Sequence, residues 1–270
     1  MMTRMPELSR RTFMGLGLGA AGAFALGTAA PAAAAPTSSN GFFISAARGN
    51  VPTQWAIARP PGTTTPLRPI IALHGKGQSA AGVMAGGVEQ ALAGAVAAGL
   101  PPVAVVAVDG GGSYWHRRAN GEDAGGMVLN ELIPILGTQE IDTSRVAFLG
   151  WSMGGYGALL LGSQLGPART AAICAVSPAL WTSAGAAAPY AFDGAEDYQA
   201  NSVWGRPELN SIPLRIDCGD SDPFAEATRQ FIAQLPNPPA GGFSPGGHDA
   251  GYWSGQLPAE LGWIAPLLVA

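Results

Sequence analysis

The sequence predicts an α/β fold, with a mostly parallel sheet flanked by helices on both faces. Short apolar runs alternate with longer segments of helical spacing, and uninterrupted apolar runs indicate strands that are buried on both sides. Strands are expected at residues 54–58, 70–73, 103–108, 146–149, 171–176 and 214–218. Helices are expected at residues 88–98, 127–136, 155–165, 224–235 and 257–268. This repeated alternation of strand and helix specifies a parallel sheet covered on both sides.

The first 35 residues are organised differently from the rest and predict a signal peptide. Arg10 and Arg11 precede a long uncharged stretch that ends in alanines and prolines. Residues 9–14 resemble a twin-arginine export signal, whose paired arginines are read by a receptor. A membrane anchor is the alternative, but the many glycines and the small residues 32–35 favour cleavage near residues 35–37. We expect a secreted or cell-wall-associated protein with no stable membrane insertion after signal removal.

The composition excludes some classes of partner. Charged residues make up 12% of the 270 residues and the formal net charge is −4. The chain therefore lacks the basic stripe of a nucleic-acid-binding protein, and we expect a neutral or small substrate. Both cysteines, Cys174 and Cys218, fall in expected strands. They could form a disulfide in an oxidising compartment or remain buried thiols, and the sequence leaves both alternatives open.

Residues 150–154, Gly-Trp-Ser-Met-Gly, predict a nucleophilic serine at Ser152. In this pattern the serine occupies a strained turn between a strand and a helix, and a side chain at either flanking glycine would collide with its neighbours. The apolar run before the motif and the helical run after it provide the context that the motif requires. A glycine-rich turn without chemistry is the alternative.

A serine hydroxyl needs a base to remove its proton, and His248 is the one histidine that follows Ser152. The chain order serine, acid, histidine is typical of this motif. The acid should follow the last expected strand, where Asp217, Asp220 and Asp222 are found. We favour Asp222 because a helix starts directly after it. Asp220 is the main alternative, whereas Asp217 should point sideways from the strand.

Two backbone amides should form the oxyanion hole for the tetrahedral intermediate. One is the amide of Met153, directly after the nucleophile. The other should come from the loop after the second expected strand, where glycines let the backbone approach the substrate. Lys76 is the favoured donor and Gly75 the next candidate. The side chain of His74 is expected to support this loop by hydrogen bonds, and a generic turn is the alternative for the whole segment.

Residues 177–211 form the longest segment without an expected strand or helix, which suggests a lid or a pocket wall. Its aromatic residues could line a substrate pocket or anchor the segment to the core. His116 should lie near the rim of the site and could contact the substrate. A structural role is favoured for it, with surface ion pairs between the neighbouring arginines 117 and 118 and the acidic residues Glu122 and Asp123. No metal or cofactor motif is present, and we expect neither.

These motifs resemble the esterase D and antigen 85 branch of the α/β-hydrolases, and most of all the exported esterases of actinobacterial type. The most specific pieces are residues 150–155, residues 216–224, and His248 with the Tyr-Trp pair that follows it. The resemblance implies an α/β-hydrolase catalytic domain over residues 36–270, without a large cap domain.

In the esterase D pattern the acid falls on Asp222, and the oxyanion donors fall on Lys76 and Met153. Together with Ser152 and His248, the resemblance implies a serine esterase that hydrolyses a small-molecule or lipid ester through an acyl-serine intermediate, without a cofactor. Two other functions use the same fold: acyl transfer to a sugar or lipid alcohol, and non-catalytic binding to a cell wall or host. Substrate specificity and oligomeric state cannot be derived from the sequence.

Overall fold

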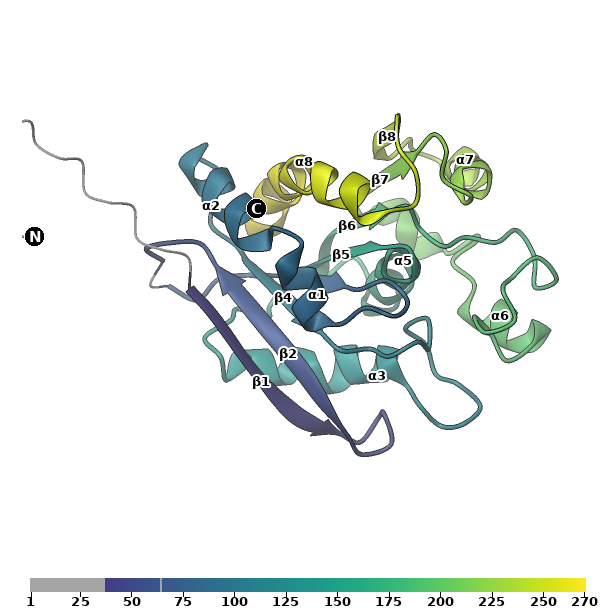
Figure 1. The fold of residues 1–270 in the computed structure, drawn as a ribbon, viewed down its shortest axis with the longest axis horizontal. Helices are drawn as coiled ribbons and strands as arrows, with labels where there is room; N and C mark the ends of the chain where they lie inside the picture. The colour runs from purple at the N-terminus through teal and green to yellow at the C-terminus, as the bar shows by residue number, and fades with distance from the viewer. Residues whose placement is uncertain (1–36, 64) are drawn as a thin grey trace, which may run out of the picture. The chain divides into compact units, whose positions relative to one another are not determined.

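The computed structural model describes residues 37–63 and 65–270, so the expected signal peptide at residues 1–35 lies outside it. The strands are β1 (Thr37–Ser45), β2 (Val51–Arg59), β3 (Pro69–Leu73), β4 (Ala104–Val108), β5 (Val146–Trp151), β6 (Thr170–Val176), β7 (Leu214–Gly219) and β8 (Ala240–Ser244). Together they form one sheet in the order β1-β2-β4-β3-β5-β6-β7-β8 (Figure 1). The pairs β1–β2 and β2–β4 are antiparallel, and every other neighbouring pair is parallel.

The helical elements follow the strands along the chain. They are α1 (Ala80–Ala85), α2 (Val88–Ala97), α3 (Ala124–Met127), the π-helical turn η1 (Val128–Leu132), α4 (Ile133–Gly137), α5 (Met153–Leu165), α6 (Ala195–Asn201), the 3₁₀ turn η2 (Pro207–Ser211), α7 (Ala225–Gln234) and α8 (Ala250–Val269). No helix in the described part of the chain is long and apolar enough to cross a bilayer.

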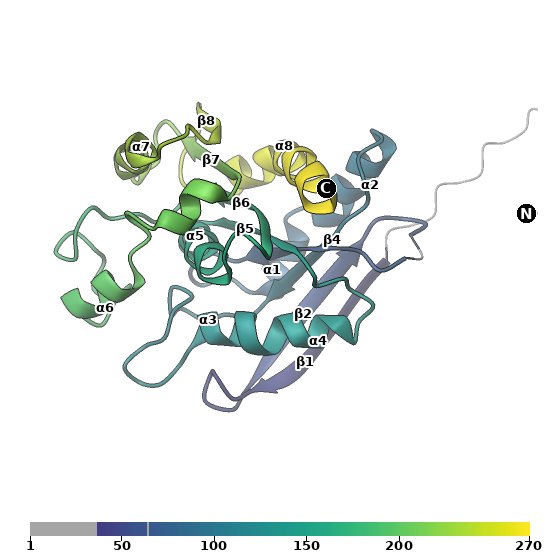
Figure 2. The same cartoon turned by 180° about the vertical axis from the view of Figure 1, so that it is seen from behind.

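Helices cover both faces of the sheet and enclose two apolar cores. One core lies under α1, α2 and α8, and the other under α3, α4 and α5 (Figure 2). Strand β3 contributes side chains to both cores, because successive side chains of a strand point to opposite faces. Ile70 and Ala72 contribute to the first core, and Ile71 and Leu73 to the second, all completely buried. The predicted α/β fold with a mostly parallel sheet is confirmed.

The two edge strands were not predicted. β1 pairs with β2, yet its sequence Thr-Ser-Ser-Asn-Gly-Phe-Phe-Ile-Ser lacks a continuous apolar run, because one edge and much of one face are exposed. β8 contains two adjacent glycines, Gly241 and Gly242, which are poor strand formers. Only strands buried on both faces carry the signal on which the prediction depended.

Two helical predictions need correction. The last helix begins at Ala250, seven residues before the expected start at residue 257, because Asp249 caps it by accepting the amide of Tyr252 at 3.0 Å. Two glycines and Pro258 had obscured the helical spacing there. The segment 177–211 is also not irregular throughout, since it contains α6 and η2. The first turn of helix α6 carries Glu196 and Asp197, acidic side chains that suit a helix N-terminus.

Candidate active site

Three residues singled out in the sequence lie at the same edge of the sheet. Ser152 follows β5, Asp222 follows β7, and His248 follows β8. The strands from β5 to β8 are neighbours and run parallel. Their carboxyl ends therefore meet at one edge, where the connecting loops of an open α/β sheet converge.

Ser152 occupies a strained turn. Its φ of 57° and ψ of −121° lie outside the regions that side-chain-bearing residues ordinarily adopt. The neighbouring glycines make the turn possible. A Cβ on Gly150 would overlap the backbone of Gly154, and a Cβ on Gly154 would overlap the carbonyl group of Leu73. The amide of Ser152 donates to the carbonyl oxygen of Val176 at 3.0 Å, so the turn is also held from the adjacent strand.

His248 lies between Ser152 and Asp222. Its Nε2 is 2.8 Å from Ser152 Oγ, and its Nδ1 is 2.8 Å from Asp222 Oδ2. When Nδ1 carries the proton and donates to the carboxylate, Nε2 is free to accept the serine hydroxyl. The ring also contacts Phe224 and Trp253, with ring centroids 5.2 Å and 5.1 Å away. The structure thus brings together the hydroxyl, imidazole and carboxylate expected from the sequence.

The carboxylate of Asp222 is completely buried. It accepts the amide of Phe224 at 2.8 Å as well as the His248 ring. Burial alone would raise its pKa, but the hydrogen bond from His248 and the one from the Phe224 amide outweigh burial and lower the pKa below the usual 3.8. Asp222 is therefore ionised at neutral pH and can hold the imidazole in one tautomer.

The other two aspartates of this region are engaged elsewhere. Asp220 is half exposed and lies 3.6 Å from the guanidinium of Arg229. Asp217 binds the guanidinium of Arg215 with both carboxylate oxygens, at 2.6 Å and 3.0 Å. The geometry accordingly supports Asp222, and not Asp220, as the partner of the histidine.

The loop after β3 is fixed by His74. This side chain is fully buried, with Nδ1 2.8 Å from the carbonyl oxygen of Gly75 and Nε2 accepting the amide of Gly110 at 2.9 Å. Burial lowers the pKa of His74, which keeps the ring neutral with its proton on Nδ1. His74 thus ties this loop to the loop after β4 and does not face the reacting groups.

The same loop approaches Ser152 closely, since a Cβ on Gly75 would lie 3.6 Å from Ser152 Cβ. The Gly75 amide already donates to Gln78 Oε1 at 3.1 Å. In contrast, the amides of Lys76 and Met153 have no acceptor among the described residues. Met153 is the first residue of α5, where helix amides lack intrahelical partners and carry partial positive charge. Because its amide is free in the described part of the chain, Lys76 is favoured over Gly75 as the second donor of the expected oxyanion hole.

Sequence reasoning did not single out Gln78. Its Oε1 accepts the indole N–H of Trp151 at 2.8 Å in addition to the amide of Gly75. One carboxamide therefore connects the loop after β3 to the residue that precedes Ser152. Gln78 and Trp151 are far apart in sequence, and no local pattern indicates the contact between them.

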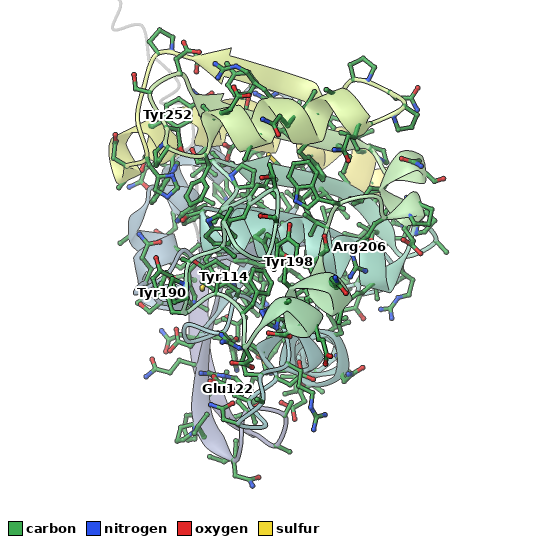
Figure 3. The ribbon with its side chains drawn as sticks, turned by 90° about the vertical axis from the view of Figure 1, so that its right-hand side faces the viewer. Tyr114, Glu122, Tyr190, Tyr198, Arg206 and Tyr252 are labelled. Carbon is green, nitrogen blue, oxygen red and sulfur yellow. The ribbon has the colours of Figure 1, made fainter. Side chains whose placement is uncertain are left out.

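The segment 177–211 reaches this loop through Tyr190. The ammonium group of Lys76 lies 3.4 Å from the centre of the Tyr190 ring, a cation–π contact. Tyr190 is 51% exposed and lies beside the buried Tyr114, with ring centroids 6.2 Å apart (Figure 3).

Most other aromatic residues of the segment serve as anchors. Phe192 and Tyr198 are buried and pack edge to face, with ring centroids 5.1 Å apart. The hydroxyl of Tyr198 and the indole N–H of Trp204 both donate to the carbonyl oxygen of Trp181, at 2.7 Å and 2.8 Å. The sequence left open whether these aromatic residues line a substrate pocket or anchor the segment to the core. Their contacts support anchoring.

His116 is only 2% exposed. Its ring nitrogens lie 3.0 Å from the carbonyl oxygens of Arg117 and Ala191, and its ring stacks on Phe192 with centroids 5.2 Å apart. His116 thus joins the loop after β4 to the segment 177–211. These contacts support the structural role over contact with substrate.

The prediction that arginines 117 and 118 form ion pairs with Glu122 and Asp123 is wrong. Arg118 pairs with Asp193 at 2.7 Å, and Glu122 pairs with Arg48 at 2.9 Å. Asp123 caps the first turn of α3 instead of binding an arginine. Partners distant in sequence are brought within reach by the fold, which a local charge pattern cannot indicate.

One buried group in the described part of the chain contains three residues of metal-binding type, Cys174, Asp217 and Glu260, whose ligand atoms lie within 4.8 Å of one another. Asp217 is already paired with Arg215. Burial raises the pKa of Glu260 and of Cys174 well above their usual values, so both hold their protons. A protonated thiol and a protonated carboxyl are poor metal ligands, and we assign no ion to this group.

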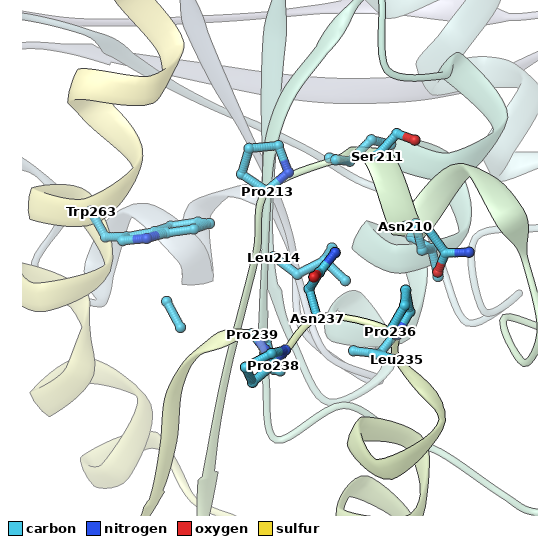
Figure 4. Close-up of a pocket in the computed structure, with 13 residues that line it drawn as sticks. Asn210, Ser211, Pro213, Leu214, Leu235, Pro236, Asn237, Pro238, Pro239 and Trp263 are labelled. Carbon is cyan, nitrogen blue, oxygen red and sulfur yellow. The ribbon is translucent and has the colours of Figure 1, made fainter.

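A pocket of about 390 Å³ lies at the opposite edge of the sheet (Figure 4). Leu214, the first residue of β7, and Trp263 of α8 help to line it. Asp222 follows the other end of β7, so this pocket is separate from the site around Ser152.

Comparison with known proteins assigns the family. The family model described as "Putative esterase" matches residues 51–264. The chain belongs to this esterase family, as the sequence motifs predicted. No curated protein matches the chain significantly.

Solved structures with the same fold include several hydrolases. A ferulic acid esterase is 20% identical with a TM-score of 0.75, over 88% of this chain and 100% of that one. An S-formylglutathione hydrolase from Agrobacterium tumefaciens is 18% identical with a TM-score of 0.67, over 88% and 97% of the two chains. MPT51 from Mycobacterium tuberculosis is 20% identical with a TM-score of 0.68, over 86% and 99%. At these identities the likeness establishes the α/β-hydrolase fold.

Proposed function

We propose that this esterase is a serine hydrolase that cleaves carboxylic esters of small molecules or lipids through an acyl-serine intermediate. The supporting observation is the position of His248, 2.8 Å from both Ser152 Oγ and Asp222 Oδ2. An imidazole bonded to a hydroxyl on one side and to a buried carboxylate on the other is the arrangement that activates a serine.

In the first half of the reaction, Ser152 Oγ attacks the ester carbonyl carbon while His248 Nε2 accepts the hydroxyl proton. The carbonyl oxygen becomes an oxyanion, to which the amides of Lys76 and Met153 donate. Asp222 stabilises the imidazolium that forms. The tetrahedral intermediate then collapses, the bond to the alkoxy oxygen breaks, and the proton on Nε2 passes to the departing alcohol.

In the second half, a water molecule takes the place of the alcohol. His248 Nε2 accepts a proton from this water as its oxygen attacks the acyl carbon. The second tetrahedral intermediate releases Ser152 Oγ, which recovers its proton from Nε2, and the carboxylic acid leaves. The cycle consumes one water and one ester, and it requires no redox step.

A fluorophosphonate probe together with p-nitrophenyl acetate tests the proposal. The wild-type protein should be labelled and should hydrolyse the ester, whereas Ser152→Ala should do neither. Ser144→Ala, which removes an exposed serine away from the site, should behave like wild type. Equal labelling of wild type and Ser152→Ala would refute the serine mechanism.

We further propose that residues 1–35 direct export as a twin-arginine-type signal, on the support of the Arg10–Arg11 pair and the uncharged stretch after it. Replacement of both Arg10 and Arg11 by lysine should retain the full chain inside the cell, as measured by immunoblotting of cells and medium. Arg4→Lys, which changes an arginine outside the pair, should be exported normally. Export of the double variant at the wild-type level would contradict this assignment.

A further inference from the structure

An apolar pocket and groove adjoin Trp253, a residue that contacts His248 of the site. A narrow pocket of about 50 Å³ lies between α1 and the start of α8, and Trp151 and Trp253 form part of its wall. The two indoles stack with centroids 6.3 Å apart, and Trp253 also packs edge-on against the His248 ring. Two of its wall residues thus connect it to the site, because Trp253 contacts His248 and Trp151 directly precedes Ser152.

A wider groove of about 520 Å³ continues from the pocket between α2 and α8. Gly86, Ser254 and Leu257 line both spaces, so the narrow pocket and the groove adjoin. Figure 1 shows α2 lying alongside α8 on the same face of the sheet. The ten residues of α2 make this part of the groove about 15 Å long, at 1.5 Å of rise per residue.

The lining of the groove is suited to an apolar occupant. Helix α2 presents Ala91, Gly94 and Ala95 to it, and Leu100 and Pro258 also line it. Gln90 is the one longer side chain that α2 contributes to the lining, and the small residues beside it leave the space open. Among the described residues, none with a charged side chain lines the pocket or the groove, so no ion pair would hold a charged group there.

We propose that the pocket and groove together form a subsite for a linear aliphatic chain of the ester, attached to the acyl or the alcohol side of the scissile bond. This inference rests on the proposed function and specifies its substrate class as esters that carry a medium-length alkyl chain. The narrow pocket between α1 and α8 admits an unbranched chain, and the groove between α2 and α8 receives its end. Each methylene group buried there should raise kcat/KM about fourfold.

The first experiment measures kcat/KM for p-nitrophenyl esters from acetate to dodecanoate and for a matching series of alkyl acetates. The wild-type protein should prefer longer chains in one of the two series. Gly94→Leu should fill the groove, because a Cβ at this position meets only open space and leucine favours a helix more than glycine does. This variant should lose about tenfold or more on the ten-carbon ester, the equivalent of two excluded methylenes, and retain the acetate activity.

Gly255→Leu is the matched control. Gly255 is also a helical glycine with open space at its Cβ, but it lines neither the pocket nor the groove. It should leave both the short-chain and the long-chain activities at the wild-type level. Flat profiles in both series, or the same profile for wild type and Gly94→Leu, would overturn the subsite.

A binding measurement separates failure of the subsite from failure of the proposed function. Calorimetric titration of Ser152→Ala with sodium decanoate requires no turnover, and it should show binding that the Gly94→Leu substitution weakens in the same background. If no ester is hydrolysed but decanoate binds in this manner, the serine mechanism is wrong and the subsite stands. If esters are hydrolysed but Gly94→Leu changes neither decanoate binding nor the chain-length profile, the subsite is wrong and the mechanism stands.

Discussion

The indole N–H of Trp151 donates to Gln78 Oε1 at 2.8 Å, and this contact joins the turn at Ser152 to the loop after β3, which carries the proposed oxyanion donor Lys76. Because the same oxygen accepts the amide of Gly75 at 3.1 Å, Gln78 determines how that loop faces Ser152. In the proposed mechanism these two elements act on one carbonyl group, and both donate to the same side-chain oxygen.

Loss of this acceptor should slow catalysis. We expect Gln78→Leu to lower kcat about tenfold with a smaller change in KM, because a displaced oxyanion donor weakens the transition state more than the ground state. Gln78→Glu retains an oxygen at the same position and should recover most of the activity. Steady-state kinetics on p-nitrophenyl acetate gives both values, and equal activity of all three proteins would exclude this role for Gln78.

We propose that the backbone amide of Lys76 donates to the oxyanion. Its side chain should therefore be dispensable for the chemistry. We expect Lys76→Met to retain kcat within about threefold, since the amide remains and the exposed cation–π contact with Tyr190 contributes about 0.5–1 kcal/mol. The measurement is kcat on p-nitrophenyl acetate. A loss of two orders of magnitude would instead mean that the ammonium group acts on the substrate.

Removal of the charge at Asp222 should be far more damaging than removal of the charge at Asp220. Asp222→Asn should lower kcat by about 10³- to 10⁴-fold, because the amide no longer holds His248 in the required tautomer. Asp220→Asn should remain close to wild type, since Asp220 is half exposed and lies near Arg229. Near-normal turnover by Asp222→Asn would show that another acid serves the histidine.

Gly154→Ala should destabilise the fold, because its Cβ would overlap the carbonyl group of Leu73 in the central strand β3. We expect a loss of more than about 3 kcal/mol in the free energy of unfolding, measured with urea. Gly255→Ala, at a helical position with open space, should instead stabilise by about 1 kcal/mol. Equal stability of the two variants would contradict the close packing at the nucleophile turn.

His74 should contribute a pH dependence to stability. Its pKa in the folded state is lowered by burial from the usual 6.5, so the unfolded chain binds more protons as the pH falls below 6.5. The stability contributed by neutral His74 is therefore complete above pH 6.5 and is lost as the pH falls through the folded-state pKa. Urea titrations from pH 7.5 to 4.5 should show this slope in wild type and a shallower one in His74→Gln. Identical slopes would show that His74 titrates normally.

The central strands could be predicted from sequence because burial on both faces leaves a continuous apolar run, as in β4 with all five residues buried. The edge strands could not, because an exposed face admits polar residues and glycines. For the site, a glycine pattern and the chain order predicted Ser152 and His248, which the structure brings within 2.8 Å of each other. Gln78 and the Arg118–Asp193 pair could not be identified, because such contacts exist only after distant segments have come together.

The two thiols remain unpaired and buried. Cys174 lies in the core under α8, and Cys218 alternates along β7 with Asp217, the neighbour of Cys174, and so faces the other way. Burial raises the pKa of Cys218 to about 12, which leaves it unreactive as a nucleophile. No covalent cross-link thus constrains the chain, and dithiothreitol in the buffer should not reduce its melting temperature. Refolding from denaturant needs no oxidation step.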